Sequence, residues 1–352
     1  SKKINNESLV AVVGCYSQVS PEEVEKIEGV DVIIGTSERN QIVQLCERAK
    51  KSSEKINVVR SIKTYKEFEK INIDEIKSKT RAFLKIQDGC NQFCSYCIIP
   101  YARGPIRSRE YQDIEKEAEK LAIAGFKEIV LTGIHVASYG KDLKRESLRE
   151  VIEKISKIEG IQRIRLSSVE PNLIDDEFMK TMTSSKNVCD HFHLSLQSGA
   201  DSVLSRMNRK YTTEEFMEKV EIIRKYMPQA GITTDIIVGF PGETDEEFNE
   251  TMNFVKAVGF SRIHVFKYSP RKGTPAASMD GQIHGDVKSK RSEELIKLGE
   301  ELTIAFNSKF NHKKLAVLFE EKTKGKSNVY EGYTTNYIRV QAPSPNDIIG
   351  EI

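Results

Sequence analysis

The sequence predicts an α/β protein with a partial (β/α)6 barrel, preceded by part of a smaller α/β domain and followed by a small all-β barrel. From Arg81 onward, short apolar runs alternate with helical patterns, which indicates parallel strands joined by right-handed crossovers. About six strand–helix units fit, fewer than the eight of a closed barrel. The length of 352 residues exceeds one ordinary domain, so two or three are expected.

Residues 1–60 are predicted to form the first, incomplete domain. Apolar runs at 9–13 and 30–34 are typical of buried strands. Between them, Ser20 and Pro21 mark a helix start, with serine as the cap, proline at the first helical position and a glutamate that completes a capping box. This alternation of strand and helix places the segment in the α/β class.

A linker is predicted at 61–79, within a stretch from 48 to 79 that is rich in lysine and serine and weakly periodic. The barrel is expected over 80–303. Its strands are predicted at 83–86, 129–131, 164–166, 193–196, 233–238 and 263–266. A long helix at 286–308 ends this block. Short β-like pieces at 315–320, 327–334 and 337–341 predict an incomplete module at 304–352.

Composition narrows the possible functions. The net charge of +2 is too small to predict nucleic-acid binding by the whole surface, so such binding must come from local basic patches. The sequence contains no apolar run of about 18 residues and no signal peptide, which predicts a cytoplasmic protein with no membrane partner. The chain starts with Ser1, and residues 347–352 look like an interrupted strand. We therefore expect truncation at both ends.

Three of the six cysteines, Cys90, Cys94 and Cys97, fall within eight residues in the spacing C-x3-C-x2-C. In a large chain without a signal peptide, such crowding favours metal binding over disulfides. Three thiolates can hold three irons of a 4Fe–4S cube and leave the fourth iron open to a chelating molecule such as S-adenosylmethionine (SAM). Structural zinc prefers four ligands, and the next histidine is His135, so zinc is the weaker alternative.

The stretch from Gln87 to Arg109 resembles the radical SAM methylthiotransferases. Its segment Tyr-Ala-Arg-Gly-Pro-x-Arg-Ser-Arg, at 101–109, resembles the branch that acts on N6-threonylcarbamoyladenosine (t6A) in tRNA. Further matching motifs occur in order at 14–18, 193–199 and 235–244, so the resemblance covers nearly the whole chain. It implies a radical SAM barrel between part of a flavodoxin-like methylthiotransferase domain and a TRAM-like RNA-binding barrel.

The resemblance also implies roles for individual residues. Cys90, Cys94 and Cys97 match the ligands of the catalytic radical SAM cluster. The implied SAM-binding residues are Tyr96, Thr132, Gly133, Ser195, Gln197, Arg209, Asp235 and Tyr268. Each also has a structural interpretation: core packing for the aromatic residues, a turn for the glycine and a solvated strand end for the polar ones.

Cys15 matches the third ligand of an auxiliary 4Fe–4S cluster whose other two cysteines are expected upstream of this chain. Cys46 and Cys189 do not match any ligand position, and they are interpreted as buried apolar residues. The C-terminal module is expected to bind tRNA through basic and exposed aromatic side chains. These are Lys313, Lys314, Lys322, Lys324, Lys326, Tyr330, Tyr333, Tyr337 and Arg339.

The implied reaction replaces the C2–H of t6A, at position 37 next to the anticodon, with a methylthio group. One SAM supplies the methyl group and a second SAM the radical, with an external electron donor and a monomeric enzyme. The carboxylate of t6A is expected to be bound by a cationic side chain. The candidates are Arg103, Arg107, Arg109 and Arg165. The alternative is that these arginines contact tRNA phosphates or solvent.

Three other functions remain open at this point. One is a sister methylthiotransferase that acts on isopentenyladenosine in tRNA or on a ribosomal-protein aspartate. Another is a different radical SAM enzyme, such as a coproporphyrinogen-type oxidase. The third is a non-catalytic, metal-containing RNA-binding module.

Overall fold

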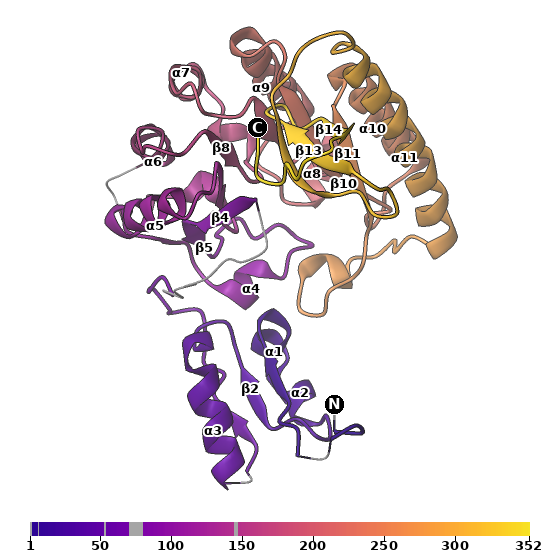
Figure 1. Cartoon of the computed structure of the whole chain (residues 1–352). Helices are drawn as coiled ribbons and strands as arrows, with labels where there is room; N and C mark the ends of the chain where they lie inside the picture. The colour runs from indigo at the N-terminus through magenta and orange to yellow at the C-terminus, as the bar shows by residue number, and fades with distance from the viewer. Residues whose placement is uncertain (1, 6, 53, 70–79, 144–146) are drawn as a thin grey trace.

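The computed structural model describes residues 2–5, 7–52, 54–69, 80–143 and 147–352. Figure 1 shows a smaller N-terminal unit that stands apart from a larger body, which contains most of the strands and helices. Part of the expected linker, residues 70–79, lies outside the described residues. Among the helices described, none is both long enough and apolar enough to span a bilayer.

Over the residues that the structure describes, the N-terminal unit is a three-stranded parallel sheet in the order β1-β2-β3 with three α-helices. Its elements are β1 (Ala11–Val13), α1 (Cys15–Val19), α2 (Pro21–Glu25), β2 (Val32–Ile34), α3 (Ile42–Ser52) and β3 (Ile56–Asn57). The α/β pattern is therefore confirmed here, but one local expectation is wrong, because Ser20 makes no side-chain cap bond to α2. The end of α3 and all of β3 lie in the first part of the lysine- and serine-rich stretch 48–79, before the predicted linker at 61–79.

The larger body contains six parallel strands in two sheets, β4-β7-β8 and β9-β10-β11. Their bounds are β4 (Arg81–Lys85), β7 (Glu128–Thr132), β8 (Arg163–Leu166), β9 (His191–His193), β10 (Gly231–Val238) and β11 (Arg262–Lys267). Parallel bridges between Ile164 and Val188 and between Val169 and Leu194 join β8 to the β9 segment. The strands thus follow one another in chain order, as the alternating pattern predicts.

Helices cover one face of these strands. They are α5 (Tyr111–Ile123), α6 (Leu148–Ile155), α7 (Asp176–Ser184), α8 (Asp201–Arg206), α9 (Thr213–Tyr226), α10 (Asp245–Val258) and α11 (Gly285–Ser308). Ala82 and Leu84 of β4 are fully buried in the core that these helices share, whereas Phe83 between them is 49% exposed. Because side chains alternate along a strand, the face opposite the helices carries the polar and half-exposed residues.

Strand β9 starts and ends earlier than the predicted range 193–196. Beyond His193 the regular backbone ladder is interrupted, because the Leu196 amide donates to the Thr234 hydroxyl at 3.1 Å. Gln197 then adopts a left-handed backbone conformation with a φ of 73°. Ser195 and Gln197 therefore follow the strand rather than lie on it, and strand alternation does not place their side chains on one face.

The C-terminal sheet is antiparallel and contains β12 (Val317–Lys322), β13 (Val329–Thr334) and β14 (Arg339–Pro343). The turn between β13 and β14 reaches the polar face of the barrel strands. Arg165 Nη1 donates to the Thr335 carbonyl at 2.9 Å, and the Tyr337 ring stacks on His191 with centroids 4.5 Å apart.

The aromatic residues of this sheet do not have the exposure expected of them. Tyr330 is 2% exposed, so the expectation that it presents its ring to RNA bases is wrong. Tyr333 stacks on Tyr337 with centroids 4.8 Å apart, and both rings are half-buried. These rings attach the sheet to the barrel strands and contribute to packing rather than to an open stacking platform.

The buried carboxylate of Glu128 pairs with arginines at the junction between the barrel strands and the C-terminal sheet, where Glu320 of β12 also pairs with Arg81 at 2.9 Å. Glu128 accepts a hydrogen bond from Arg165 Nε at 2.7 Å, while Arg163 Nη1 and Arg81 Nη1 lie 3.7 and 3.9 Å from its oxygens. Glu128 is 1% exposed and Arg165 3%. The arginines also donate to backbone carbonyls of the C-terminal sheet, so the carboxylate supports the attachment of the whole module.

We expect Glu128→Ala to lower the stability of the protein by about 3–5 kcal/mol, because it leaves buried guanidinium groups without their carboxylate. Urea unfolding followed by fluorescence measures the change. The matched control is Glu294→Ala, at an exposed position on α11. Equal unfolding midpoints for the two variants would show that Glu128 does not stabilise the junction.

Candidate active site

The three clustered cysteines lie in the loop between β5 (Gln87–Asp88) and α4 (Ile99–Arg103). The middle of this loop is fixed to the end of α8. The Ser95 amide donates to the Met207 carbonyl at 3.0 Å, and the Ser95 hydroxyl donates to the Arg206 carbonyl at 2.7 Å. The thiols are therefore presented from a loop that is held at its centre as well as at its ends.

The start of the loop is constrained by close backbone contacts. Gly89 has a φ of 74°, and an added Cβ would lie 1.9 Å from the Pro105 carbonyl oxygen, so glycine is required there. The buried Gln87 side chain donates to the carbonyls of Asp88 and Gly89, both at 2.7 Å, and accepts from the His135 amide at 2.7 Å. These contacts fix the path of the chain into the cysteine loop.

Thr132 and Gly133, two of the predicted SAM-binding residues, lie beside this entry. Thr132 ends β7 and pairs with Lys85 of β4. An added Cβ on Gly133 would lie 2.8 Å from the Gln87 side-chain oxygen, so this backbone passes close to the segment that leads to the cysteines. The structure thus brings the end of the second barrel strand next to the cysteine loop.

Cys94 is buried, whereas Cys90 and Cys97 are half-buried, and all three are free thiols. Arg209 Nη1 lies 3.2 Å from Cys94 Sγ, which brings one predicted site residue directly to the cysteines. Nη2 of the same guanidinium group donates to both carboxylate oxygens of Glu170, at 2.8 and 2.7 Å. Glu170 therefore orients the arginine, a role that the sequence motifs did not reveal.

Burial raises the pKa of Cys90 to about 11 and also raises that of Cys97. These groups are protonated at neutral pH until a metal displaces the protons. Among the described residues, no three cysteine, histidine or acidic side chains form a group suited to a single metal ion. A 4Fe–4S cube has a different requirement, since each thiolate binds its own iron. Three free thiols in one fixed loop fit that requirement.

Tyr96 and Tyr268, predicted to flank the SAM adenine, lie in one apolar cluster. Tyr96 packs against it, and Tyr268 and Phe240 belong to its buried part, with their ring centroids 5.4 Å apart. Burial raises the pKa of Tyr96 well above its ordinary value, so its hydroxyl stays protonated. The cluster thus offers aromatic surface directly beside Cys97.

Of the remaining polar candidates, Asp235 lies on β10, and Ser195 and Gln197 lie in the segment after β9. The backbone amide of Gln197 donates to the backbone carbonyl of Asp235 at 2.9 Å, which brings these two residues together. Asp235 Oδ2 lies 3.2 Å from His193 Nε2, and His193 Nδ1 lies 2.9 Å from the Thr233 hydroxyl. His193 is the first residue of the motif at 193–199, but no role was predicted for it, although its place two residues before Ser195 was a usable signal.

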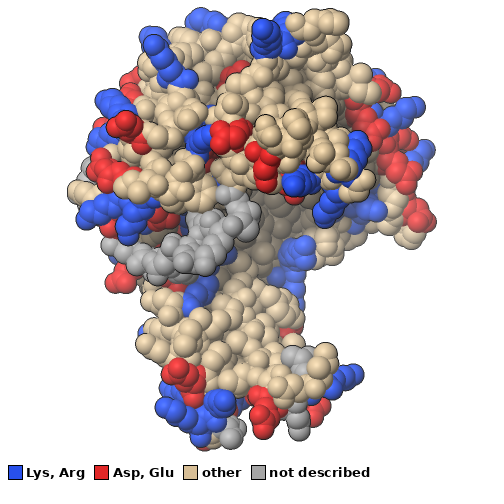
Figure 2. Space-filling view, viewed as in Figure 1, with Lys and Arg blue, Asp and Glu red and all other residues tan. Residues whose placement is uncertain are grey.

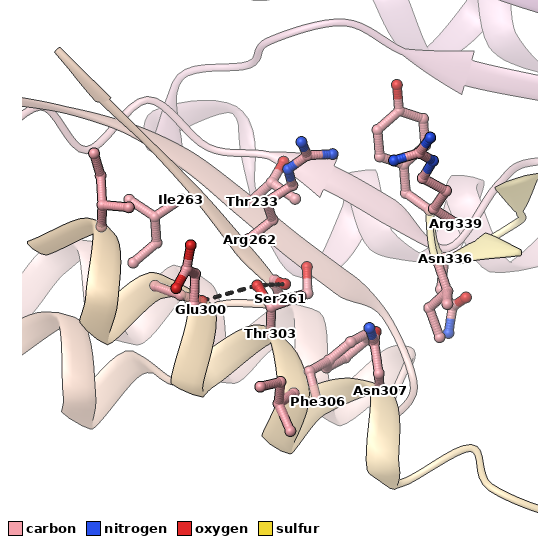
Figure 3. Close-up of a pocket in the computed structure, with 15 residues that line it drawn as sticks. Thr233, Ser261, Arg262, Ile263, Glu300, Thr303, Phe306, Asn307, Asn336 and Arg339 are labelled. Carbon is pink, nitrogen blue, oxygen red and sulfur yellow. Dashed lines mark hydrogen bonds between the residues drawn. The ribbon is translucent and has the colours of Figure 1, made fainter. Parts of the chain in front are cut away.

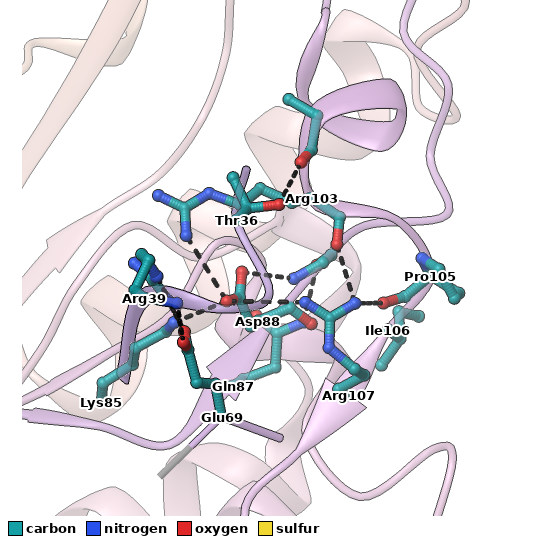
Figure 4. Close-up of polar contacts among 12 residues, drawn as sticks. Thr36, Arg39, Glu69, Lys85, Gln87, Asp88, Arg103, Pro105, Ile106 and Arg107 are labelled. Atoms are coloured by element: carbon teal, nitrogen blue, oxygen red, sulfur yellow. Dashed lines mark hydrogen bonds and ion pairs between the residues drawn. The ribbon is translucent and has the colours of Figure 1, made fainter. Parts of the chain in front are cut away.

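The four candidate arginines have different surroundings, and two of them gather at Asp88 (Figure 4). Arg103 Nη1 lies 3.6 Å from Asp88 Oδ2, and Arg107 Nη2 lies at the same distance from that oxygen. Arg109 forms an ion pair with Glu117. Arg165 is engaged with Glu128 and the C-terminal sheet, at a separate place in the fold.

Cys15, the candidate for the auxiliary cluster, is half-buried at the first position of α1, which packs against α4. The Thr36 hydroxyl also donates to the Ala102 carbonyl at 2.7 Å, so the N-terminal unit contacts the helix that follows the cysteine loop. A cavity of about 720 Å³ opens at this junction and is lined by residues of both units, including Tyr101 and Lys272. Figure 2 shows a recess between the two units.

A second cavity, of about 540 Å³, lies between β11, α11 and the turn that precedes β14 (Figure 3). Its lining includes Arg262, Asn307, Asn336 and Arg339, and none of the residues predicted to bind the iron–sulfur clusters, SAM or the substrate carboxylate. It is therefore separate from the cysteine site.

Glu247 of α10 secures the helix end that holds the cysteine loop. It accepts hydrogen bonds from Arg206 at 2.9 and 2.7 Å, and the Arg206 carbonyl receives the Ser95 hydroxyl. The hydrogen bonds from Arg206 are the main cause that lowers the pKa of Glu247 to about 2, from an ordinary value of 4.5. A lowered pKa stabilises the fold above pH 4.5, and this contribution is lost as the pH falls toward 2.

We expect Glu247→Gln to have a lower thermal midpoint than the unsubstituted protein at pH 6. The difference between the two midpoints should become smaller as the pH falls toward 3. Thermal melts followed by circular dichroism at several pH values measure this. Glu250→Gln, at an exposed position on the same helix, is the control. A difference that stays constant across the pH range would contradict the role of the ionised Glu247.

Comparisons with known proteins agree with this geometry. The family model described as "Radical SAM superfamily" matches residues 84–255. "Threonylcarbamoyladenosine tRNA methylthiotransferase MtaB" of Bacillus subtilis is 42% identical, and the match covers 99% of this chain and 78% of that protein. "tRNA-2-methylthio-N(6)-dimethylallyladenosine synthase" of Clostridium tetani is 39% identical, with 100% and 78% covered.

Among solved structures, the cobalamin-dependent SAM radical enzyme OxsB has a similar fold, with a TM-score of 0.55 at 16% identity over 85% of this chain and 44% of that one. The high identity to tRNA-modifying methylthiotransferases over almost the whole chain, together with the match to the radical SAM model, establishes the family. The chain belongs to the radical SAM methylthiotransferases.

Proposed function

We propose that this protein adds a methylthio group to C2 of N6-threonylcarbamoyladenosine at position 37 of tRNA. The observation that carries the proposal is the fixed loop with three free thiols beside an aromatic cluster, in a chain 42% identical to an enzyme of that name. A relative named for dimethylallyladenosine is 39% identical, so the sister reaction on an apolar adenosine modification is the second candidate.

The residues of the loop and its surroundings have distinct roles in this proposal. Cys90, Cys94 and Cys97 hold the irons, and Arg209, 3.2 Å from Cys94 Sγ, stabilises the negative charge on that sulfur. A 4Fe–4S cluster with bound SAM supplies the radical chemistry that an aromatic C–H bond requires. Tyr96 and Tyr268 offer aromatic surface for the SAM adenine and exclude water from it.

The polar candidates come from neighbouring strand ends and the segments that follow them. Thr132 and Gly133 offer backbone groups beside the cysteine loop, and Ser195, Gln197 and Asp235 offer polar groups on β10 and in the segment after β9. We assign these residues to SAM binding because β4 pairs with β7 and β9 with β10, which places their strand ends side by side.

The two flanking units complete the enzyme. We propose that the barrel strands form a partial six-unit barrel over 80–303, and that residues 1–60 are part of a flavodoxin-like domain. In that domain Cys15 is one ligand of an auxiliary 4Fe–4S cluster. Support comes from the parallel β1-β2-β3 sheet and from the packing of α1, which begins at Cys15, against α4. Substrate then enters at the junction between the two units, where the 720 Å³ cavity lies.

We assign residues 304–352 to a TRAM-like module that binds tRNA. The exposed lysines at the end of β12 and in the turn that follows, Lys322, Lys324 and Lys326, are suited to phosphate contacts. The enzyme acts as a monomer in the cytoplasm, where its tRNA substrate is found, and takes electrons from an external donor.

We expect Cys94→Ala to abolish formation of 5′-deoxyadenosine from SAM, because two thiolates cannot hold the cube with one iron open. The protein is reconstituted anaerobically with iron and sulfide and is supplied with SAM, t6A-containing tRNA and a one-electron reductant. Mass spectrometry then measures both 5′-deoxyadenosine and the nucleosides of the tRNA. The unsubstituted protein and Cys46→Ala should both yield the 2-methylthio product. A deoxyadenosine yield from Cys94→Ala equal to that of Cys46→Ala would overturn the site assignment.

We expect the triple change of Lys322, Lys324 and Lys326 to alanine to weaken tRNA binding and to reduce its dependence on salt, because fewer counterions are released. Filter binding over a series of salt concentrations measures both quantities. The control changes Lys116, Lys120 and Lys256, exposed on α5 and α10, to alanine. If the two triple variants bind tRNA alike, the module does not carry the phosphate contacts assigned to it.

A further inference from the structure

Asp88 lies two residues before the first cysteine of the loop and gathers three cations around one carboxylate oxygen. Lys85 Nζ lies 2.6 Å from Asp88 Oδ2, and the nearest nitrogens of Arg103 and Arg107 lie 3.6 Å from the same atom. Asp88 is 2% exposed. Figure 4 shows these side chains converging on Asp88 from β4, α4 and β6 (Arg107–Ser108).

This cluster has more positive than negative charge. Among the described residues, three cations share Asp88, and the neighbouring Arg39 is paired with Glu69 through a 2.7 Å hydrogen bond. A partly buried excess of positive charge is unfavourable unless an anion compensates it. The Nε atoms of Arg103 and Arg107 are buried and have no hydrogen-bond partner among the described residues. Within the described residues, the cluster therefore carries two more positive than negative charges.

Exposure decides which cation can meet a ligand. The Lys85 side chain is 37% exposed and that of Arg103 19%, whereas that of Arg107 is only 3%. Arg107 Nη1 also donates to the carbonyls of Arg103 and Pro105, at 2.7 and 3.0 Å. Arg107 thus forms the floor of the cluster as a positioning residue, and Lys85 and Arg103 are left to contact a ligand.

We propose that Lys85 and Arg103 bind the carboxylate of the substrate's modified adenosine, with Asp88 and Arg107 holding them in place. The inference rests on the proposed function and names the residues that give it specificity. Lys85 is the last residue of β4 and lies on the face opposite the helices. It comes three residues before Asp88, after which the cysteine loop begins. An adenine that reacts at this loop would place a short anionic arm within reach of both cations.

The same cations could instead meet a phosphate of the tRNA backbone, and the two anions can be separated by experiment. Binding is measured for a tRNA that carries t6A and for the same tRNA without the modification, which has all the phosphates but lacks the carboxylate. The variants are Lys85→Met, Arg103→Met and Lys85→Arg, and Lys256→Met on the exposed face of α10 is the control.

We expect Lys85→Met and Arg103→Met each to lower the affinity for t6A-tRNA about tenfold, the usual effect of losing one charge-assisted hydrogen bond, and to leave unmodified tRNA unaffected. Lys85→Arg should keep most of the preference, and Lys256→Met all of it. Equal weakening of both tRNAs would assign the cluster to phosphate and overturn the proposal. Unchanged binding of both tRNAs by both methionine variants would overturn it as well.

This test does not depend on turnover. If the unsubstituted protein prefers t6A-tRNA and loses that preference in Lys85→Met, the carboxylate site stands even where no 2-methylthio product is found. Such a result would overturn only the proposed reaction. If the unsubstituted protein makes the product but binds both tRNAs equally, the reaction stands and the carboxylate site is wrong.

Discussion

A layer of parallel strands covered by helices on one side must find partners for the polar side chains on its other side, and much of this structure follows from that requirement. At the beginning of the strands, the partners are arginines, one carboxylate and the carbonyls of the C-terminal sheet. At their ends, the partners are the groups around the cysteine loop. One face of the sheet thus binds a second module at one end and forms the candidate active site at the other.

The cysteine loop needs a rigid frame because the protein must hold three sulfurs in place while it leaves a fourth coordination position open. The frame consists mainly of backbone groups: the Ser95 contacts to α8, the Gly89 contact with Pro105 and the hydrogen bonds of Gln87. Side-chain chemistry is then added by Arg209, which Glu170 orients toward Cys94. Because the pKa values of the thiols are raised, the thiols are neutral until a metal binds and displaces their protons.

Local patterns were sufficient to predict the order of the barrel strands and the cysteine triplet, because strand–helix alternation and close cysteine spacing are properties of short stretches of sequence. Contacts between distant residues were not predictable in this way. The displacement of β9 depends on the hydroxyl of Thr234 on the next strand, and the burial of Tyr330 depends on how the C-terminal sheet folds. The charge cluster at Asp88 was not predicted, because Lys85 and Arg103 are distant in sequence and come together only in the folded chain.

The turn between β13 and β14 limits how the C-terminal module could be replaced by the module of another protein. Tyr337 has a φ of 70°, unusual for a bulky side chain, and its ring is held between Tyr333 and His191. A C-terminal module grafted from another protein would lack this fit and would leave His191 and Arg165 uncovered. Chimeras that replace the C-terminal module therefore need their junction placed after this turn, or the contacting ends of the parallel strands redesigned together with it.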